Sequence, residues 1–505
     1  QPKGLYALAL ANTGERFGYY TMIAVFSLFL RANFGLSGDT AGLIYGVFLA
    51  LVYFLPLVGG IMADKFGYGK MVTIGIIVMF AGYLFLSIPL GGGVMGYAAM
   101  FGALLLVSLG TGLFKGNLQV MVGNLYDAPE LSAKRDSGFS IFYMAINIGA
   151  LFAPTAAVRI KEWAEHALGY SGNDAYHFSF AVACVSLIVS MMIYYAFRST
   201  FKHVEAGAGK SKKTDTTVAA EELTPQQTKE RIVALCLVFA VVIFFWMSFH
   251  QNGLTLTFFA DEFVSPKAEG IQTMAFDVIN LVMIIFMVYS LMSFFQSKTS
   301  KAKLISTVVF LAAVGVLVYK YHNIGGPVDV SAPIFQQFNP FYVVALTPVS
   351  MAIFGALAAK GKEPTAPRKI AYGMIIAGSA YLLMVLASRG LLTPNEQDAA
   401  KAAGETVPFA SGNWLIGTYL VLTFGELLLS PMGISFVSKV APPKYKGTMM
   451  GGWFVATAIG NLLVSVGGFL WNDIPLTIVW SVFIVLCLLS AGFMFLMMKR
   501  LEKVA

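Results

Sequence analysis

The sequence predicts an all-α membrane protein with about fourteen transmembrane helices. Of its 505 residues, 57% are hydrophobic and 12% are charged, and the mean hydropathy is +0.74. A soluble protein of this length cannot bury so much apolar surface, whereas a bilayer needs about 20 apolar residues for each helix. The predicted spans are residues 5–31, 37–62, 70–90, 95–124, 138–158, 176–198, 230–258, 273–296, 301–320, 335–358, 368–388, 413–439, 447–471 and 475–498.

Basic residues gather in alternate loops of this pattern, and this asymmetry predicts the orientation. With the amino terminus in the cytoplasm, most of the 34 Lys and Arg residues fall in cytoplasmic loops, among them Lys210 to Lys213 and Lys298 to Lys303. We therefore expect both termini to be cytoplasmic. The net charge of +8 comes from these scattered loops and not from one soluble face, so nucleic-acid binding is not expected.

One long hydrophilic stretch, residues 199–229, divides the chain. Its Gly, Lys, Thr and Glu content is typical of a cytoplasmic linker. It separates an N-terminal six-helix bundle, 1–198, from a C-terminal part, 230–505, that holds a second six-helix bundle and an extra transmembrane hairpin at about 273–320. This layout, with the turn motif Gly59–Lys70 after the second span, resembles that of major facilitator transporters.

Two opposite charges, Glu15 and Arg16, lie near the middle of the first predicted span. A charged side chain there costs about 2.5–3.5 kcal/mol on insertion scales, so such groups usually face a water-filled cavity or a polar partner. The alternative is a pair that neutralises itself and only tolerates burial. Spacings of i, i+3, i+4, i+7 and i+8 place five residues on one helical face: Asn12, Glu15, Arg16, Tyr19 and Tyr20.

Five further sequence patterns follow one another along the chain. They are Glu15–Tyr20, Gly110–Asn117, Phe142–Gly149, Gln337–Pro340 and Gly425–Gly433. The first is similar to the motif usually written ExxERFxYY, and together they resemble the ordered motifs of the proton-coupled oligopeptide transporter family. Any one of them would be a weak signal, whereas five in order at the expected helices are specific.

The resemblance implies a function and a set of partners. It implies a bacterial inner (plasma) membrane protein with the major facilitator fold, a symporter that imports di- and tripeptides by alternating access from a central midplane cavity. Protons would be the coupling ion, with no other cofactor, and the partners would be small peptides and the lipid bilayer, without an obligatory protein partner. An enzyme is not expected, because HExxH, GxSxG and paired intramembrane aspartates are absent from the sequence. The alternative is an uncoupled facilitator, or a carrier of another small solute such as nitrate.

Charged residues deep in the spans suggest how a zwitterionic peptide could bind. Arg16 and Lys115 are expected to receive the carboxylate, and Arg16 is better suited to a bidentate contact. Glu426 is expected to receive the amino terminus. The resemblance implies that Asn147 and Asn339 assist it, although buried amides also serve as hydrogen-bonding contacts between helices.

Aromatic residues near these positions are candidate walls of the pocket, although simple core packing explains them equally well in a chain with 14% aromatics. The candidates are Tyr19, Tyr20, Tyr53, Trp453 and Phe454. The cysteines Cys184, Cys236 and Cys487 lie within apolar spans, so we expect no disulfide framework and no metal site.

Proton coupling needs a group whose protonation changes as the cavity opens, closes or fills. Glu15 is such a group, because nearby cations hold it ionised and loss of a cation to the substrate favours protonation. The chain departs from the family at three positions: Asn12 replaces the first Glu of the motif, His250 an acidic residue, and Ile23 an Arg. His250 either carries a second proton, since imidazole titrates near neutral pH, or is a neutral hydrogen-bonding replacement.

Overall fold

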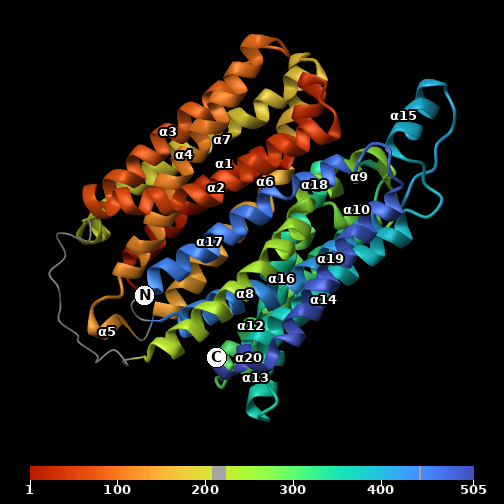
Figure 1. The fold of residues 1–505 in the computed structure, drawn as a ribbon. Coiled ribbons are helices and arrows are strands. Elements are labelled where there is room, and N and C mark those ends of the chain that lie inside the picture. The colour runs from red at the N-terminus through yellow and green to blue at the C-terminus, as the bar shows by residue number, and fades with distance from the viewer. Residues whose placement is uncertain (133–134, 207–222, 443–444, 505) are drawn as a thin grey trace. The chain divides into compact units, whose positions relative to one another are not determined.

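Long helices make up most of the chain in the computed structural model, which describes residues 1–132, 135–206, 223–442 and 445–504 (Figure 1). The elements are α1 (Lys3–Phe34), α2 (Gly38–Phe66), α3 (Tyr68–Leu86), α4 (Val94–Asn124), α5 (Pro129–Ser132), α6 (Arg135–Leu168), α7 (Gly172–Ala196), η1 (Arg198–Thr200), η2 (Lys202–Val204), α8 (Pro225–Phe249), η4 (His250–Gly253), α9 (Thr255–Glu262), β1 (Lys267–Ala268), α10 (Gln272–Ala275), α11 (Val278–Gln296), α12 (Ser300–His322), β2 (Val328–Asp329), η5 (Ala332–Gln337), α13 (Phe338–Ala359), α14 (Ala366–Ala387), α15 (Pro394–Ala402), α16 (Asn413–Val440), α17 (Lys446–Leu462), α18 (Ser465–Phe469), α19 (Leu476–Leu496) and α20 (Met498–Val504). The strands β1 and β2 form a short antiparallel pair.

Thirteen helical segments within the described ranges are long and apolar enough to cross a membrane. Helix α1 has the length of a further span, because its 32 residues extend over about 48 Å at 1.5 Å per residue. It carries Glu15 and Arg16 in its interior. The predicted all-α membrane fold with about fourteen spanning helices is confirmed.

Residue contacts divide the chain into two compact units, which we describe separately. The first unit comprises Gln1–Leu254, Ile434–Leu470 and Lys499–Ala505, and the second comprises Thr255–Gly433 and Trp471–Met498. Helix α17 is far from α2 and α8 in sequence but packs against both within the first unit (Figure 1). The predicted boundaries at 1–198, 199–229 and 230–505 follow chain order and stay predictions.

Glycines bring the helices of the first unit close together. Helix α2 packs against α4, and a Cβ at Gly59 would overlap the backbone of Gly112. Asn117 of α4 donates its Nδ2 hydrogen to the carbonyl oxygen of Gly59 over 3.2 Å. The turn from α2 to α3 passes through Gly67, whose φ of 98° favours glycine. Two of the sequence patterns therefore meet at one helix contact.

The predicted span 230–258 lies within the candidate membrane segment Pro225–Glu262, but this segment is not one continuous helix. Helix α8 ends at Phe249, and the short turn η4 precedes α9. Gly253 lies against the hydroxyl of Tyr45 so closely that a Cβ would overlap it. At Leu254 the backbone has φ −121° and ψ −90°, outside the helical region. The chain thus unwinds where the backbone approaches α2.

The predicted span 447–471 is also interrupted, and the two interruptions meet. Helix α17 ends at Leu462 and α18 begins at Ser465. Gln251 of η4 is fully buried, and its Nε2 donates to the carbonyl oxygens of Met247, at 3.1 Å, and Val464, at 3.0 Å. Carbonyls released at a helix break inside a membrane need such donors. Gln251 therefore stabilises both breaks.

The extra helical hairpin lies in the second unit as α11 and α12, which pack against each other. Helix α11 begins at Val278 and not near 273, because Asp277 caps it by accepting from the backbone N–H of Ile279 over 2.9 Å. Only 11% of the apolar window of α12 is buried, against 56% for the segment Pro225–Glu262. The hairpin is therefore largely available to lipid.

The first part of the predicted linker is ordered against the first unit. Phe201 is fully buried, and Glu205 accepts hydrogen bonds from Arg198 and from the hydroxyl of Tyr194, the latter at 3.0 Å. The hydrogen bonds from Arg198 to the Glu205 carboxylate raise the pKa of Arg198 above its ordinary value. Residues 207–222, with Lys210 to Lys213, lie outside the described part of the chain.

Replacing Gly468 by Ala tests the close packing of α18 against α2. A Cβ at Gly468 would overlap the carbonyl oxygen of Gly38 and approach Cα of Gly42 within 3.0 Å. We expect Gly468→Ala to lower the stability of the purified protein by about 1–3 kcal/mol, as overpacking does. Thermal unfolding in detergent measures the effect. Gly102→Ala is the matched control, since a Cβ there meets nothing within 4 Å; equal melting temperatures for the two variants would contradict this packing.

Candidate functional site

The centre of α1 carries a buried ion pair. Arg16 donates from Nε to Glu15 Oε2 at 2.5 Å and from Nη2 to Glu15 Oε1 at 2.6 Å, so the contact is bidentate. The side chain of Glu15 is fully buried and that of Arg16 is 4% exposed. The structure therefore brings the two predicted residues together in the geometry that makes guanidinium–carboxylate pairs strong.

Neighbouring helices hold α1 at this depth through small residues. Ser190 of α7 donates its hydroxyl to the carbonyl oxygen of Ala11 at 2.5 Å. Thr13 of α1 donates to the carbonyl oxygen of Ala145 of α6 at 3.0 Å. A Cβ at Gly149 of α6 would come within 2.9 Å of the carbonyl oxygen of Thr13, which requires glycine for this approach. The Phe142–Gly149 pattern thus positions the helix that carries the ion pair.

The cation of the pair lies over an aromatic ring. The guanidinium of Arg16 lies 4.5 Å from the ring centroid of Tyr19, which is 4% exposed. Tyr20 packs edge-on against Tyr19 with centroids 5.3 Å apart. Asn12 is buried on the same helix, at 3% exposure. Four residues of the predicted polar face of α1 are therefore buried, and Tyr20 is half-buried.

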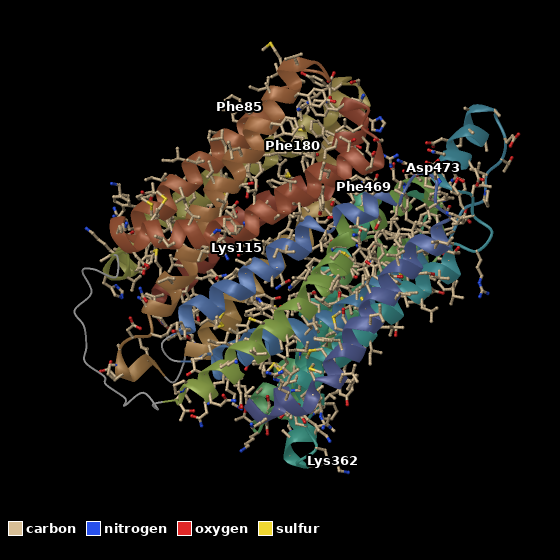
Figure 2. All side chains as sticks on the ribbon, in the orientation of Figure 1. Phe85, Lys115, Phe180, Lys362, Phe469 and Asp473 are labelled. Atoms are coloured by element: carbon tan, nitrogen blue, oxygen red, sulfur yellow. The ribbon has the colours of Figure 1, made fainter. Side chains whose placement is uncertain are left out.

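The second predicted cation, Lys115 of α4, lies over an aromatic ring. Its Nζ is 4.2 Å from the centroid of the Tyr53 ring, and it forms no ion pair with the described residues (Figure 2 labels Lys115). Lys115 is nevertheless within electrostatic range of both Glu15 and Arg16. A cation held by an aromatic face keeps its charge available to an incoming carboxylate.

The Tyr53 ring also links Lys115 to His250. The ring centroids of Tyr53 and His250 are 6.0 Å apart, and Trp246 stacks on His250 at 5.1 Å. His250 Nδ1 lies 2.5 Å from Oδ1 of Asn461, a fully buried residue of α17. The sequence analysis missed Asn461. A polar amide inside an apolar span was the available signal, but its pairing with His250 joins positions 211 residues apart.

Two of three further predicted residues in the first unit have a hydrogen bond to a residue of their own helix. Asn147, which is 8% exposed, donates from Nδ2 to the carbonyl oxygen of Tyr143 one turn earlier on the same helix, at 3.0 Å. Trp453 of α17 is buried at 3% exposure, and its carbonyl oxygen accepts from Thr457 at 2.9 Å. Phe454 is 39% exposed. These contacts leave a substrate role for the three residues as a prediction.

The second unit holds the predicted acidic group. Asn339 of α13 donates from Nδ2 to Oε2 of Glu426 at 2.9 Å and to the hydroxyl of Thr423 at 3.0 Å. Glu426 lies on α16, which continues through Pro431, and it forms no ion pair with the described residues. Thr423 is a further contact that the sequence analysis missed. A carboxylate held by a neutral amide keeps its charge available to a cation.

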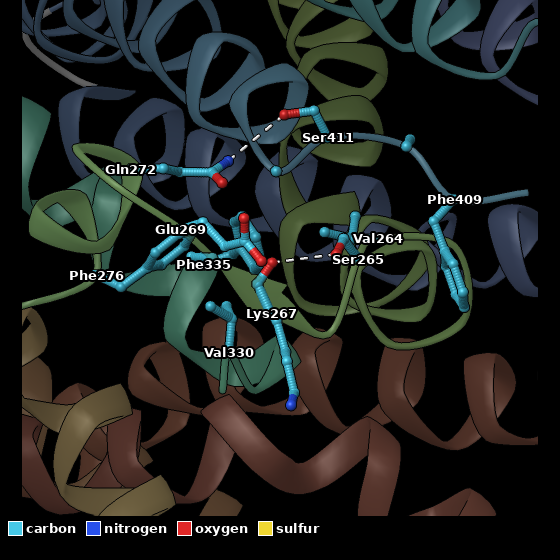
Figure 3. Close-up of a pocket in the computed structure, with 13 residues that line it drawn as sticks. Val264, Ser265, Lys267, Glu269, Gln272, Phe276, Val330, Phe335, Phe409 and Ser411 are labelled. Atoms are coloured by element: carbon cyan, nitrogen blue, oxygen red, sulfur yellow. Dashed lines mark hydrogen bonds between the residues drawn. The ribbon is translucent and has the colours of Figure 1, made fainter. Parts of the chain in front are cut away.

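A cavity of about 310 Å³ also lies in the second unit (Figure 3). Its lining includes Phe276, Phe335 and Gln272, and Gln272 Nε2 lies 3.5 Å from the hydroxyl oxygen of Ser411. Figure 3 shows the side chain of Lys267 pointing away from these residues. The predicted site residues do not line this cavity, so it contributes nothing to the charged groups described above.

The fold and these charged groups define a class of protein: a multi-pass membrane transporter with the major facilitator fold. The chain belongs to the POT family, whose model matches residues 69–219 and 320–479. The resemblance drawn from the five sequence patterns is thereby confirmed.

Similar proteins cover nearly the whole chain. It is 26% identical over 479 residues to dipeptide and tripeptide permease B of Xenorhabdus bovienii, covering 92% of this chain and 86% of the relative. It is 28% identical over 496 residues to a di-/tripeptide transporter of Lactococcus lactis subsp. cremoris, covering 92% and 88%. An uncharacterized transporter of Bacillus subtilis is 29% identical over 523 residues, covering 99% and 94%.

Solved structures show the same fold. The crystal structure of a peptide transporter POT in complex with sulfate matches with a TM-score of 0.74 at 21% identity, covering 100% of this chain and 96% of the other. A POT family transporter in complex with 5-aminolevulinic acid matches with a TM-score of 0.73 at 20% identity, covering 100% and 97%.

Replacing Arg16 by Met tests whether the buried pair is mutually dependent. The single variant leaves Glu15 buried without its cation, which should cost about 3–5 kcal/mol of stability. The double variant Glu15→Gln/Arg16→Met removes both charges and should recover most of this loss. Thermal unfolding of the purified proteins in detergent at pH 8 compares them. A double variant as unstable as the single one would show that the pair is not the cause.

Proposed function

We propose that this protein is a proton-coupled symporter that imports di- and tripeptides by alternating access, and not an enzyme. The observation that carries the proposal is a set of half-buried charges within the helices: Lys115 and Glu426 are each held by a neutral partner and form no ion pair with the described residues. Relatives named as di- and tripeptide permeases support the substrate class. A membrane protein keeps such groups for a charged ligand.

We propose that the first unit binds the carboxylate of the peptide. The Glu15 carboxylate uses the Nε and Nη2 hydrogens of Arg16 that face it. A guanidinium has five N–H donors, so the Nη1 edge of Arg16 remains for a second carboxylate. Lys115 adds a second cation. Moving its ammonium group from the Tyr53 ring to a carboxylate costs little, because the lost cation–π contact contributes about 0.5–2 kcal/mol.

Glu426 of the second unit is proposed to bind the amino terminus. Its Oε2 accepts from Asn339, which leaves Oε1 with its lone pairs for an ammonium group. Asn339 is itself fixed by the Thr423 hydroxyl, so the carboxylate is oriented before the peptide arrives. Asn147 and the aromatic residues Tyr19, Tyr20, Tyr53 and Trp453 are proposed to line the peptide path.

Protons are proposed as the coupling ion, with Glu15 as the first carrier. When a peptide carboxylate binds Arg16, the guanidinium is shared between this carboxylate and Glu15. The charged form of Glu15 is then less stabilised. A proton then binds a Glu15 oxygen, and the neutral acid releases the Nε edge of Arg16. In the inward state the proton leaves, and the ion pair of the empty carrier forms again. An uncoupled facilitator is the alternative, because Asn12 cannot titrate.

The charge pattern and the relatives support a cellular location and an orientation. We propose the bacterial inner membrane with both termini cytoplasmic, because Lys and Arg gather in alternate loops and the relatives named above are bacterial.

The Glu15→Gln variant separates proton coupling from peptide binding. Purified protein in liposomes should accumulate a labelled dipeptide when the proton gradient is directed inward. We expect Glu15→Gln to lose this accumulation at least tenfold while it keeps counterflow exchange of peptide, because a permanently neutral amide mimics the protonated acid.

The wild-type protein in the same assay distinguishes a symporter from an uncoupled facilitator and from a carrier of another solute. Wild-type protein that equilibrates peptide without accumulating it would be a facilitator, and wild-type protein without peptide flux would carry another solute. Accumulation by Glu15→Gln at the wild-type level would remove Glu15 from the coupling role.

The Glu426→Gln variant tests the amine contact. Removing the charge should weaken competition by a dipeptide with a free amino terminus about tenfold or more, because an ammonium–carboxylate hydrogen bond contributes about 1.5–3 kcal/mol. The same dipeptide with an acetylated amino terminus lacks this contact and should be affected little. Inhibition of counterflow measures both affinities, and equal losses for the two peptides would exclude the assignment.

A further inference from the structure

His250 occupies a helix break that two elements of the first unit build together. It is the first residue of η4, directly after α8, and its partner Asn461 lies in the last turn of α17, just before the second break. Gln251, the next residue, fixes both breaks through its two backbone contacts. The position of the imidazole ring is therefore set by the surrounding backbone.

The hydrogen bond to Asn461 distinguishes the two ring nitrogens. A neutral imidazole has one N–H donor and one acceptor nitrogen, and which is which depends on the hydrogen bond each makes. Nδ1 faces the carbonyl oxygen Oδ1 of Asn461, which can only accept. With the amide in this orientation, Nδ1 carries the hydrogen. Among the described residues the ring makes this one hydrogen bond, so Nε2 keeps its lone pair.

The opposite orientation of the amide would act against protonation. If Nδ2 of Asn461 faced the ring, it would donate to Nδ1 and would block the imidazolium form, in which both nitrogens carry hydrogens. With Oδ1 facing the ring, one geometry serves both charge states. In the structure Nδ2 of Asn461 is buried without a hydrogen-bond partner among the described residues, so this orientation leaves a donor unpaired.

The charged and titratable groups around the ring are few. Helix α2 brings Tyr53, α4 brings Lys115, which acts on His250 electrostatically, and α8 brings the uncharged Trp246. Helix α17 brings Asn461, without charge. Helix α1 also contacts η4, and its carboxylate is already paired within the same helix.

We propose that Asn461 is the positioning residue that holds His250 as the tautomer with hydrogen on Nδ1, so that Nε2 is the atom that takes up the second transported proton. This rests on the proposed symport function. A proton from water binds the Nε2 lone pair, the ring becomes an imidazolium, and Nδ1–H stays bonded to Asn461. Release of the same proton restores the neutral ring, so neither residue needs to move.

Two substitutions of Asn461 predict opposite shifts in the pH profile of gradient-driven uptake. Asn461→Asp keeps an acceptor oxygen and adds a negative charge, which favours the imidazolium. The midpoint should move to higher pH by about one unit or more. Asn461→Leu removes the acceptor, and the midpoint should move to lower pH. A merely structural role would reduce uptake in both variants without moving the midpoint.

A spectroscopic measurement tests the tautomer without transport. Wild-type protein labelled with ¹⁵N-histidine is compared with His250→Gln, and the signals that disappear belong to His250. At alkaline pH we expect a protonated Nδ1 and an unprotonated Nε2, and in Asn461→Leu we expect a mixture of both tautomers. A wild-type ring with hydrogen on Nε2 would overturn the proposal, as would an unchanged midpoint in Asn461→Asp.

These measurements distinguish a failure of the symport proposal from a failure of the proposed role of Asn461. Wild-type liposomes that show no gradient-driven accumulation would refute symport, and the tautomer spectrum alone would then decide whether Asn461 positions the ring. Wild-type accumulation together with hydrogen on Nε2 would leave symport standing and refute the role of Asn461.

Discussion

The buried ion pair of Glu15 and Arg16 is the constraint on which the first unit depends. Two charges taken out of water are tolerable only when they are paired and fixed in good geometry. The bidentate contact meets this condition, and α6 and α7 pack against the helix that carries it. Gly149 permits that approach and the hydroxyl of Ser190 pins the backbone of α1. These glycine and serine contacts therefore hold in place the helix that carries the ion pair.

The charged groups of the two units differ in what binds them, and the difference matters for a ligand. Arg16 is satisfied by a carboxylate, whereas Lys115 has an aromatic ring and Glu426 has an amide. Replacing an ion pair is costly, but replacing a cation–π contact or a neutral hydrogen bond by an ionic one is favourable. In the proposed mechanism, Lys115 and Glu426 are thus the groups that would gain most from a zwitterion, and Arg16 would connect binding to the protonation of Glu15.

Local properties of the sequence predict the membrane spans and the shared helical face, but they do not predict contacts between distant helices. Apolar length gives the membrane spans, and helical spacing gives the shared face of Glu15 and Arg16, because both are local properties. The interruption of the span 230–258 depends on Gly253 meeting Tyr45, a contact between distant helices that no local pattern encodes. The pairing of His250 with Asn461 has the same origin. Sequence identifies polar residues in apolar spans, but only the fold shows which of them meet.

A histidine in place of an acidic residue at position 250 changes which protonation state carries the charge. A carboxylate loses its charge when it binds a proton, whereas an imidazole gains one. A positive ring at His250 would be repelled by Lys115, which acts on it electrostatically, and both residues contact the Tyr53 ring. A peptide carboxylate bound to Lys115 neutralises this repulsion, so peptide favours the second proton. By linkage the protonated ring must then favour peptide to the same extent. Lys115, Tyr53 and His250 would in this way couple a proton to an anionic group without the acidic residue that the chain has lost.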